Sequence, residues 1–122
     1  MLWKFTGDRP VYQQIMEHIR GAILVGAYPP GGRIPPVRDL AAEAKVNPNT
    51  MQRALTELER EGLLVTCGTV GRFVTDVPEV LDNMRKTAVD ATIRASAAQF
   101  RALGLTMEEA AKLLLELEVP PA

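Results

Sequence analysis

The chain has 122 residues, of which 47% are hydrophobic and 24% are charged, and its net charge is −1. This length supports one domain or a small domain with an appendage, and it is too short for most enzymes with a separate cofactor domain. The chain has no apolar run of membrane-spanning length, no signal-peptide pattern and only one cysteine. We therefore expect a soluble protein of the reducing cytoplasm that has no membrane partner.

Two helices are predicted in the first part of the chain. Apolar residues recur at helical spacing over residues 10–25, and Gly26 ends this helix. A cluster of Pro and Gly then predicts a tight connection, followed by a very short strand at residues 33–34. A second helix is expected to begin at residue 35 or 36 and to run to residue 44.

A third helix, predicted over residues 46–62, has two faces that differ in kind. Asn47 is a good N-cap, Pro48 suits the first helical position, and Gly62 supplies a left-handed stop. One stripe is apolar and consists of Met51, Ala54, Leu55 and Leu58. The opposite stripe consists of Asn49, Gln52, Arg53 and Thr56. Amides, hydroxyls and guanidinium groups hydrogen-bond base edges in a major groove, so this stripe is typical of a recognition helix.

The region after the third helix predicts a β-hairpin. Residues 63–66 and 72–75 are β-rich runs around the turn residues 67–71. A hairpin that directly follows a helix-turn-helix is a wing. The predicted fold is therefore mainly α with a small β wing, in which a winged helix-turn-helix DNA-binding domain over residues 1–76 precedes a helical domain over residues 77–122.

The C-terminal domain is predicted to contain two helices that mediate dimerisation. A long helix follows Pro78 and ends at Gly104, and a capping box over residues 106–109 starts the last helix. Apolar residues repeat along both helices, and two helices of this length cannot bury that surface within one chain. We therefore expect an isologous homodimer. The predicted interface residues are Leu81, Met84, Ala88, Ala91, Ala95, Ala98, Leu114 and Leu117.

Charge and the types of polar residue limit the functions further. Residues 1–76 hold nine Lys or Arg and eight Asp or Glu, whereas residues 77–122 hold five and seven. The near-neutral balance argues mildly against nucleic acid, so phosphate contacts would depend on a few well-placed arginines and on symmetry. The chain has no paired carboxylates, no nucleophile with a base, no metal-ligand cluster and no phosphate loop. We therefore predict no enzyme activity, no metal and no cofactor.

Several ordered motifs carry a resemblance to a known family. They are PVYQQI in the first helix, AYPPGGRIPPVRDLA across the connection and second helix, VNPNTMQRAL in the third helix, and EREGLL before the wing. Over residues 7–75 the chain resembles the winged-helix domain of GntR-family transcriptional regulators. Its short two-helix tail resembles the YtrA-type subfamily, in which the tail dimerises.

The resemblance implies a sequence-specific DNA-binding transcriptional regulator, most simply a homodimeric repressor that binds a palindromic operator. Arg38 matches a family arginine that contacts DNA from the second helix, and Gly71 matches a wing glycine that approaches the minor groove. Contact positions of the recognition helix are matched by Asn49, Thr50, Gln52 and Arg53, to which the polar stripe adds Thr56. Arg72 is the one cation near the wing tip. Two departures are Pro36, where many members have Ser, and the wing sequence CGTVGRFV, where two glycines commonly flank one residue.

Other interpretations of these residues stay open at this point. Arg38 could pair with Asp39 or Glu43 on the surface, and Arg53 could pair with Glu57 one helical turn later. The winged helix could also serve as a protein-interaction module without DNA affinity. Alternatively, leucines of the tail could form a small effector site, which would make the protein a ligand-gated repressor. The sequence leaves open the operator, the effector and any redox role of the single cysteine.

Overall fold

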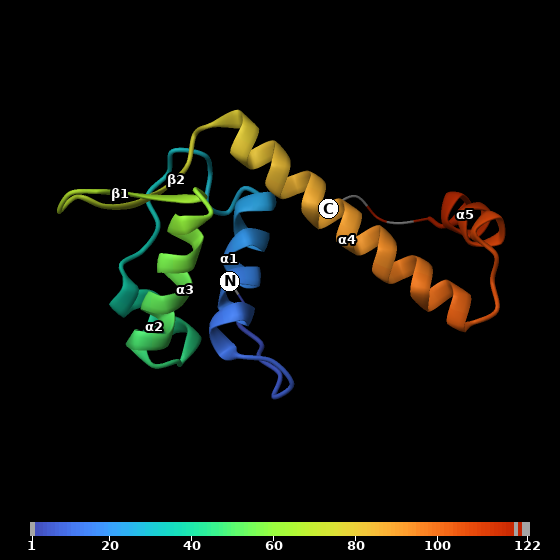
Figure 1. The fold of residues 1–122 in the computed structure, drawn as a ribbon, viewed down its shortest axis with the longest axis horizontal. Helices are drawn as coiled ribbons and strands as arrows, with labels where there is room; N and C mark the ends of the chain where they lie inside the picture. The colour runs from blue at the N-terminus through green and yellow to red at the C-terminus, as the bar shows by residue number, and fades with distance from the viewer. Residues whose placement is uncertain (1, 119, 121–122) are drawn as a thin grey trace. The chain divides into compact units, whose positions relative to one another are not determined.

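The computed structural model describes residues 2–118 and residue 120, and it contains five helices and one small antiparallel sheet within them (Figure 1). This mainly α fold with a β wing was predicted from the sequence and is confirmed. In chain order the elements are α1 (Val11–Leu24), α2 (Val37–Ala44), α3 (Pro48–Arg60), β1 (Leu64–Cys67), β2 (Gly71–Val74), α4 (Pro78–Ala102) and α5 (Met107–Glu116). By its contacts the chain divides into two units, Met1–Met84 and Arg85–Ala122.

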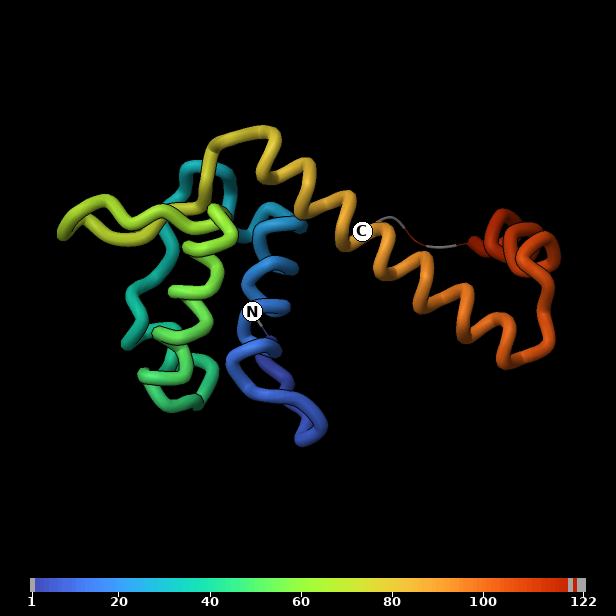
Figure 2. The backbone as a smooth tube through the Cα atoms, in the orientation of Figure 1, coloured from blue at the N-terminus to red at the C-terminus, as the bar shows by residue number. Residues whose placement is uncertain are grey.

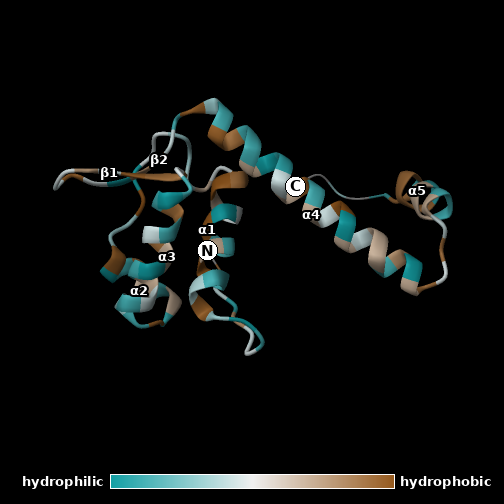
Figure 3. Cartoon of the chain, viewed as in Figure 1, coloured by the Kyte–Doolittle hydropathy of each residue, from teal (hydrophilic) through white to brown (hydrophobic). Residues whose placement is uncertain are grey.

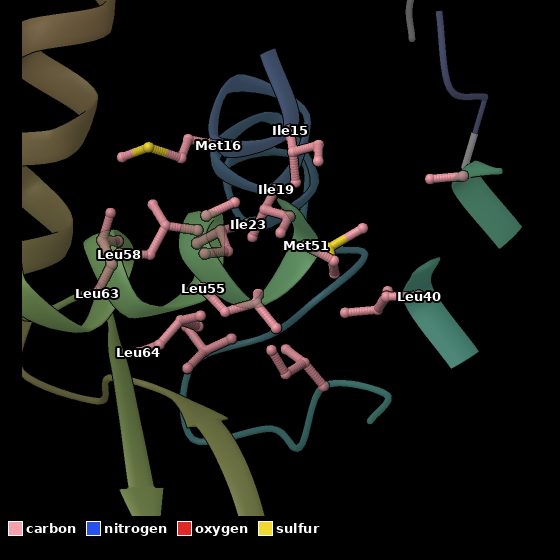
Figure 4. Close-up of a cluster of buried hydrophobic side chains, with 14 of the residues drawn as sticks. Ile15, Met16, Ile19, Ile23, Leu40, Met51, Leu55, Leu58, Leu63 and Leu64 are labelled. Atoms are coloured by element: carbon pink, nitrogen blue, oxygen red, sulfur yellow. The ribbon is translucent and has the colours of Figure 1, made fainter. Parts of the chain in front are cut away.

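The first unit is built around one apolar core between α1, α2 and α3. Ile15 and Ile19 of α1 and Leu55 of α3 have no exposed surface. Figure 4 shows side chains of α1 and α3 meeting in this core, with Leu40 of α2 beside them. Burial of each such side chain contributes about 1.5–3 kcal/mol. The apolar stripe predicted for the third helix is therefore the face that anchors α3, and its opposite face is turned outward.

The wing is a hairpin whose two strands each lie one residue closer to the turn than predicted. Cys67 pairs with Gly71, and Leu64 pairs with Val74. The backbone N–H of Val70 donates to the carbonyl of Cys67 at 3.0 Å and closes a tight turn, so the strands occupy 64–67 and 71–74. Figure 2 shows the two strands lying side by side.

The connection between α1 and α2 adds a third short segment to this sheet. Arg33 forms an isolated antiparallel bridge with Phe73, and the N–H of Ile34 donates to the carbonyl of Arg72 at 3.0 Å. The very short strand predicted at residues 33–34 is thus present as a single bridge. This pairing places Arg33 directly beside the wing.

The first turns of α4 pack onto the first unit. Val80, Leu81 and Met84 are half-buried against its core. The sequence pattern assigned Leu81 and Met84 to a contact between subunits and placed the domain boundary after residue 76. The structure packs one side of both side chains against the core of their own chain, and their part in a subunit contact stays a prediction, because helical spacing marks an apolar stripe without identifying what covers it. The division between the units consequently falls later, after Met84.

The second unit contains the remainder of α4 and α5. The predicted capping box is present, because the Thr106 hydroxyl accepts from the N–H of Glu109 while the Glu109 carboxylate accepts from the N–H of Thr106. Among the described residues of the unit, only Ala110 is buried. Brown, apolar residues recur along both helices in Figure 3. Within the described part of the chain, no helix has the length and apolar content needed to cross a membrane.

Candidate nucleic-acid interface

The outward face of α3 presents the predicted polar stripe. The Asn47 side chain accepts a hydrogen bond from the N–H of Asn49 at 2.8 Å, which caps the helix as expected. Asn49, Gln52 and Arg53 are exposed, and Thr50 and Thr56 are half-buried. The stripe therefore displays amide and guanidinium groups at the N-terminal end of the helix, where donors and acceptors suit base edges.

Gln52 and Thr56 are already connected within this stripe. The Gln52 Nε2 donates to the Thr56 Oγ1 at 3.1 Å, one helical turn apart. This bond orients the amide along the helix surface and leaves its carbonyl oxygen available as an acceptor. Thr56 therefore orients the Gln52 amide, in addition to any contact that Thr56 itself makes.

Arg53 stacks on an aromatic ring of α1. Its guanidinium carbon lies 3.8 Å from the centre of the Tyr12 ring, within the range of a cation–π interaction. The competing ion pair with Glu57 that the sequence allowed is not formed. Glu57 instead accepts from Arg60 at 2.7 Å. Arg53 is therefore held at the edge of α3 that faces α1, and among the described residues no carboxylate neutralises its charge.

The acidic residues in the last turns of α3 each accept an arginine. Glu57 pairs with Arg60, Glu59 pairs with Arg72, and Glu61 accepts from Arg20 of α1. These pairs neutralise the acidic half of the helix locally. The repulsion that three carboxylates would exert on a phosphate backbone is thereby reduced.

Arg38 lies in the first turn of α2 and is exposed. Of the residues that the structure describes, none forms an ion pair with it. The surface pairing that the sequence left open for Arg38 is therefore absent. Its guanidinium is available to an anion beside the start of α3.

The wing differs from the prediction at Arg72. Its Nε donates to the Glu59 carboxylate of α3, and its side chain is only 19% exposed. The sequence assigned Arg72 to DNA as the one cation near the tip, but the structure uses its charge to hold β2 on α3. The reason is a contact between residues 13 positions apart, which local sequence patterns do not reveal.

Arg33 is a basic residue of this surface that the sequence prediction missed. It is exposed, and it lies beside Gly71 because of its bridge to Phe73. The short strand at residues 33–34 was the one available signal, since it places this side chain against the wing. No group of three or more His, Cys, Asp or Glu side chains among residues 2–118 and 120 is placed to hold a metal ion.

Comparisons with known proteins agree with this geometry. The family model described as "Bacterial regulatory proteins, gntR family" matches residues 11–74. The HTH-type transcriptional regulator YhcF of Bacillus subtilis (strain 168) is 34% identical over 87% of this chain and 88% of its own length. The HTH-type transcriptional repressor YtrA of the same strain is 39% identical over 55% of this chain and 52% of its own length.

Two solved structures are similar to this chain in fold, and one of them is a complex with operator DNA. A GntR family transcriptional regulator from Listeria monocytogenes superposes with a TM-score of 0.84 at 27% identity, covering 93% of this chain and all of the other. AraR(DBD) in complex with operator ORX1 superposes with a TM-score of 0.57 at 29% identity, covering 62% of this chain and 96% of the other. The chain belongs to the gntR family of bacterial DNA-binding transcriptional regulators, in its YtrA-type branch.

Proposed function

We propose that the protein is a homodimeric repressor that binds a palindromic operator with one α3 helix in each of two adjacent major grooves. The two half-sites would lie about one helical turn (~34 Å) apart. A YtrA relative that is named a repressor supports the direction of regulation. The regulator would act in the cytoplasm, on the DNA of the nucleoid.

The observation that carries this proposal is the division of α3 into two faces. Met51, Leu55 and Leu58 have no exposed surface, so the helix is fixed to its own domain by one side. The other side exposes Asn49 and Gln52 near the N-terminal end. An amide in this position can pair with adenine, so these two residues would supply most of the base recognition.

The surrounding cations would position the helix on the DNA. Arg38 has no carboxylate partner in the described structure, and it would bind a backbone phosphate from α2. Arg53, stacked on Tyr12, would bind a phosphate at the edge of the groove. Thr50 and Thr56 remain predicted contacts of the same helix, and Gly71 remains a predicted contact of the wing.

Dimerisation would use the second unit. Ile93 is 61% exposed, and Leu114 is 54% exposed. The predicted interface residues Ala91, Ala95 and Ala98 are also exposed on α4, and their small side chains would let a partner helix approach closely. Apolar helix surfaces of this extent favour burial against a second copy of the chain.

Two substitutions test the assigned surface. Arg38→Ala and Arg53→Ala should each weaken binding to a duplex chosen by in vitro selection by about 100-fold, because each subunit of the dimer loses one charged hydrogen bond worth about tenfold. Lys4→Ala is the control, because it removes a positive charge from an exposed position before α1 that lies outside the assigned surface, and it should change affinity little. Size-exclusion chromatography with light scattering should show intact dimers for all three variants. Unchanged affinity in both test variants would contradict the assigned surface.

A further inference from the structure

One arginine, Arg72, lies in the wing and another, Arg33, lies beside it, and their surroundings differ. Arg72 is mostly covered, and its charge is neutralised by Glu59. Arg33 is exposed, and it has no carboxylate partner among the residues that the structure describes. Only Arg33 therefore offers an uncompensated positive charge at this position.

The Arg33 side chain lies against the backbone of the wing at Gly71. Gly71 has a φ of +139°, a conformation that other L-residues rarely adopt. A Cβ at Gly71 would lie 2.8 Å from Nε of Arg33, which is too close for the side chain as it lies, and 3.4 Å from its guanidinium carbon. The absence of a side chain at Gly71 thus lets the Arg33 guanidinium lie against the first residue of β2.

Arg33 also lies between two parts of the predicted DNA-binding surface. It lines a groove of about 330 Å³ together with Pro36 and Val37 at the start of α2, and Thr69 and Val70 at the wing tip. The start of α2 carries Arg38, and the wing tip is the part that would reach the minor groove. A phosphate bound in this groove would be contacted from both sides.

We propose that Arg33 is the phosphate-binding cation of the wing, and that Arg72 instead holds the wing on α3 through Glu59. This inference rests on the proposed function, because it assigns a further contact to the same DNA-binding surface. It also gives Gly71 a second role, since the space above Gly71 is what the Arg33 side chain occupies.

The salt dependence of binding to a random-sequence duplex tests this proposal. A duplex of about 30 base pairs is long enough for two half-sites. The slope of log K against log[salt] is negative, and its magnitude should decrease by about 0.9 for each phosphate that the protein no longer neutralises. For a dimer of Arg33→Gln, the magnitude should therefore decrease by about two. Arg33→Lys keeps the charge and should retain the slope. Lys4→Gln is the control for a charge removed elsewhere on the first unit, and its slope should match that of the wild type.

A second variant separates the roles of the two arginines. Replacing Glu59 and Arg72 together by Gln removes the ion pair without changing the net charge. This double variant should lower the thermal midpoint of unfolding and keep the wild-type salt slope. Arg33→Gln should keep the wild-type thermal midpoint and have the shallower salt slope. A full slope in Arg33→Gln, or a slope in the double variant reduced as much as predicted for Arg33→Gln, would overturn the proposal. No binding of wild-type protein to any duplex at low salt would instead refute the proposed function itself.

Discussion

The two units of this chain differ in how far they bury their apolar side chains. In the first unit, Ile15, Leu40 and Leu55 from three different helices have no exposed surface. In the second unit, Leu113 and Leu115 remain 55% and 87% exposed. The first unit therefore completes its core within one chain, whereas the second presents apolar surface that we propose a second copy covers. Reading DNA and pairing subunits are thus assigned to separate parts of the molecule.

The largest expected effect comes from a charge on the alanine stripe of α4. Ala95→Asp should place a carboxylate in the proposed subunit interface and convert the dimer to a monomer, because an unpaired buried charge is costly. Loss of the second half-site should lower operator affinity about 100-fold or more. Analytical ultracentrifugation and operator binding would measure the two effects.

Asn83→Asp is the control for that experiment. It introduces the same charge at an exposed polar position of α4, and it should leave both the dimer and the affinity intact. A fully dimeric Ala95→Asp protein at micromolar concentration would show that this stripe is not the interface.

The next effect compares one leucine from each unit. Leu55→Ala should destabilise the first unit by about 2–5 kcal/mol, because the removed atoms leave a cavity in a close-packed core. Leu115→Ala, at a side chain that is 87% exposed, should change the unfolding free energy of an isolated subunit little. Chemical denaturation at a concentration that favours monomers would measure both. Equal destabilisation by the two substitutions would contradict the claim that only the first unit completes its core within one chain.

A smaller effect is expected at the joint between α1 and α3. Tyr12→Leu keeps bulk but removes the aromatic face that holds the Arg53 guanidinium. In a double-mutant cycle with Arg53→Ala, operator binding should show a coupling of about 0.5–1 kcal/mol. Additive effects of the two substitutions would mean that the stacking does not position Arg53 for DNA.

The smallest effect concerns pH and the start of α5. Hydrogen bonds from the backbone and side chain of Thr106 lower the pKa of the Glu109 carboxyl from its ordinary value of 4.5. A lowered pKa in the folded state means that the capping contribution is present above the ordinary value and is lost as the pH falls through the folded value. An NMR titration should show the Glu109 carboxyl titrating below its ordinary pKa. Thr106→Ala should raise the Glu109 pKa only part of the way toward the ordinary value, because it removes the side-chain hydrogen bond and keeps the backbone donor. An unchanged pKa would show that the Thr106 side chain makes no contribution.

Much of the fold follows from local sequence signals. The cap at Asn47, the proline that follows it and the capping box at Thr106 each fix a helix start, and each is found in the structure. The apolar stripe of α3 correctly predicts which face is buried, because its helical period is unambiguous. The exposure of Asn49 and Gln52 follows from that same period.

Contacts between distant parts of the chain could not be predicted in this way. Arg53 stacks on Tyr12, which lies far away in the sequence on α1, rather than pairing with its neighbour Glu57. The pairing of Arg72 with Glu59 and the position of Arg33 beside Gly71 likewise depend on how the wing folds onto α3. Leu81 and Met84 show the same limit, since an apolar stripe does not name its partner.

In vitro selection of duplex DNA by the purified full-length protein tests the central claim most directly. A dimer that reads DNA through α3 should enrich a palindrome whose half-sites are centred about 10 base pairs apart, or a multiple of that spacing. Substituting Gln52 should then change the preferred base at one position of each half-site. Failure to enrich any sequence, or enrichment of a single site without symmetry, would contradict the account.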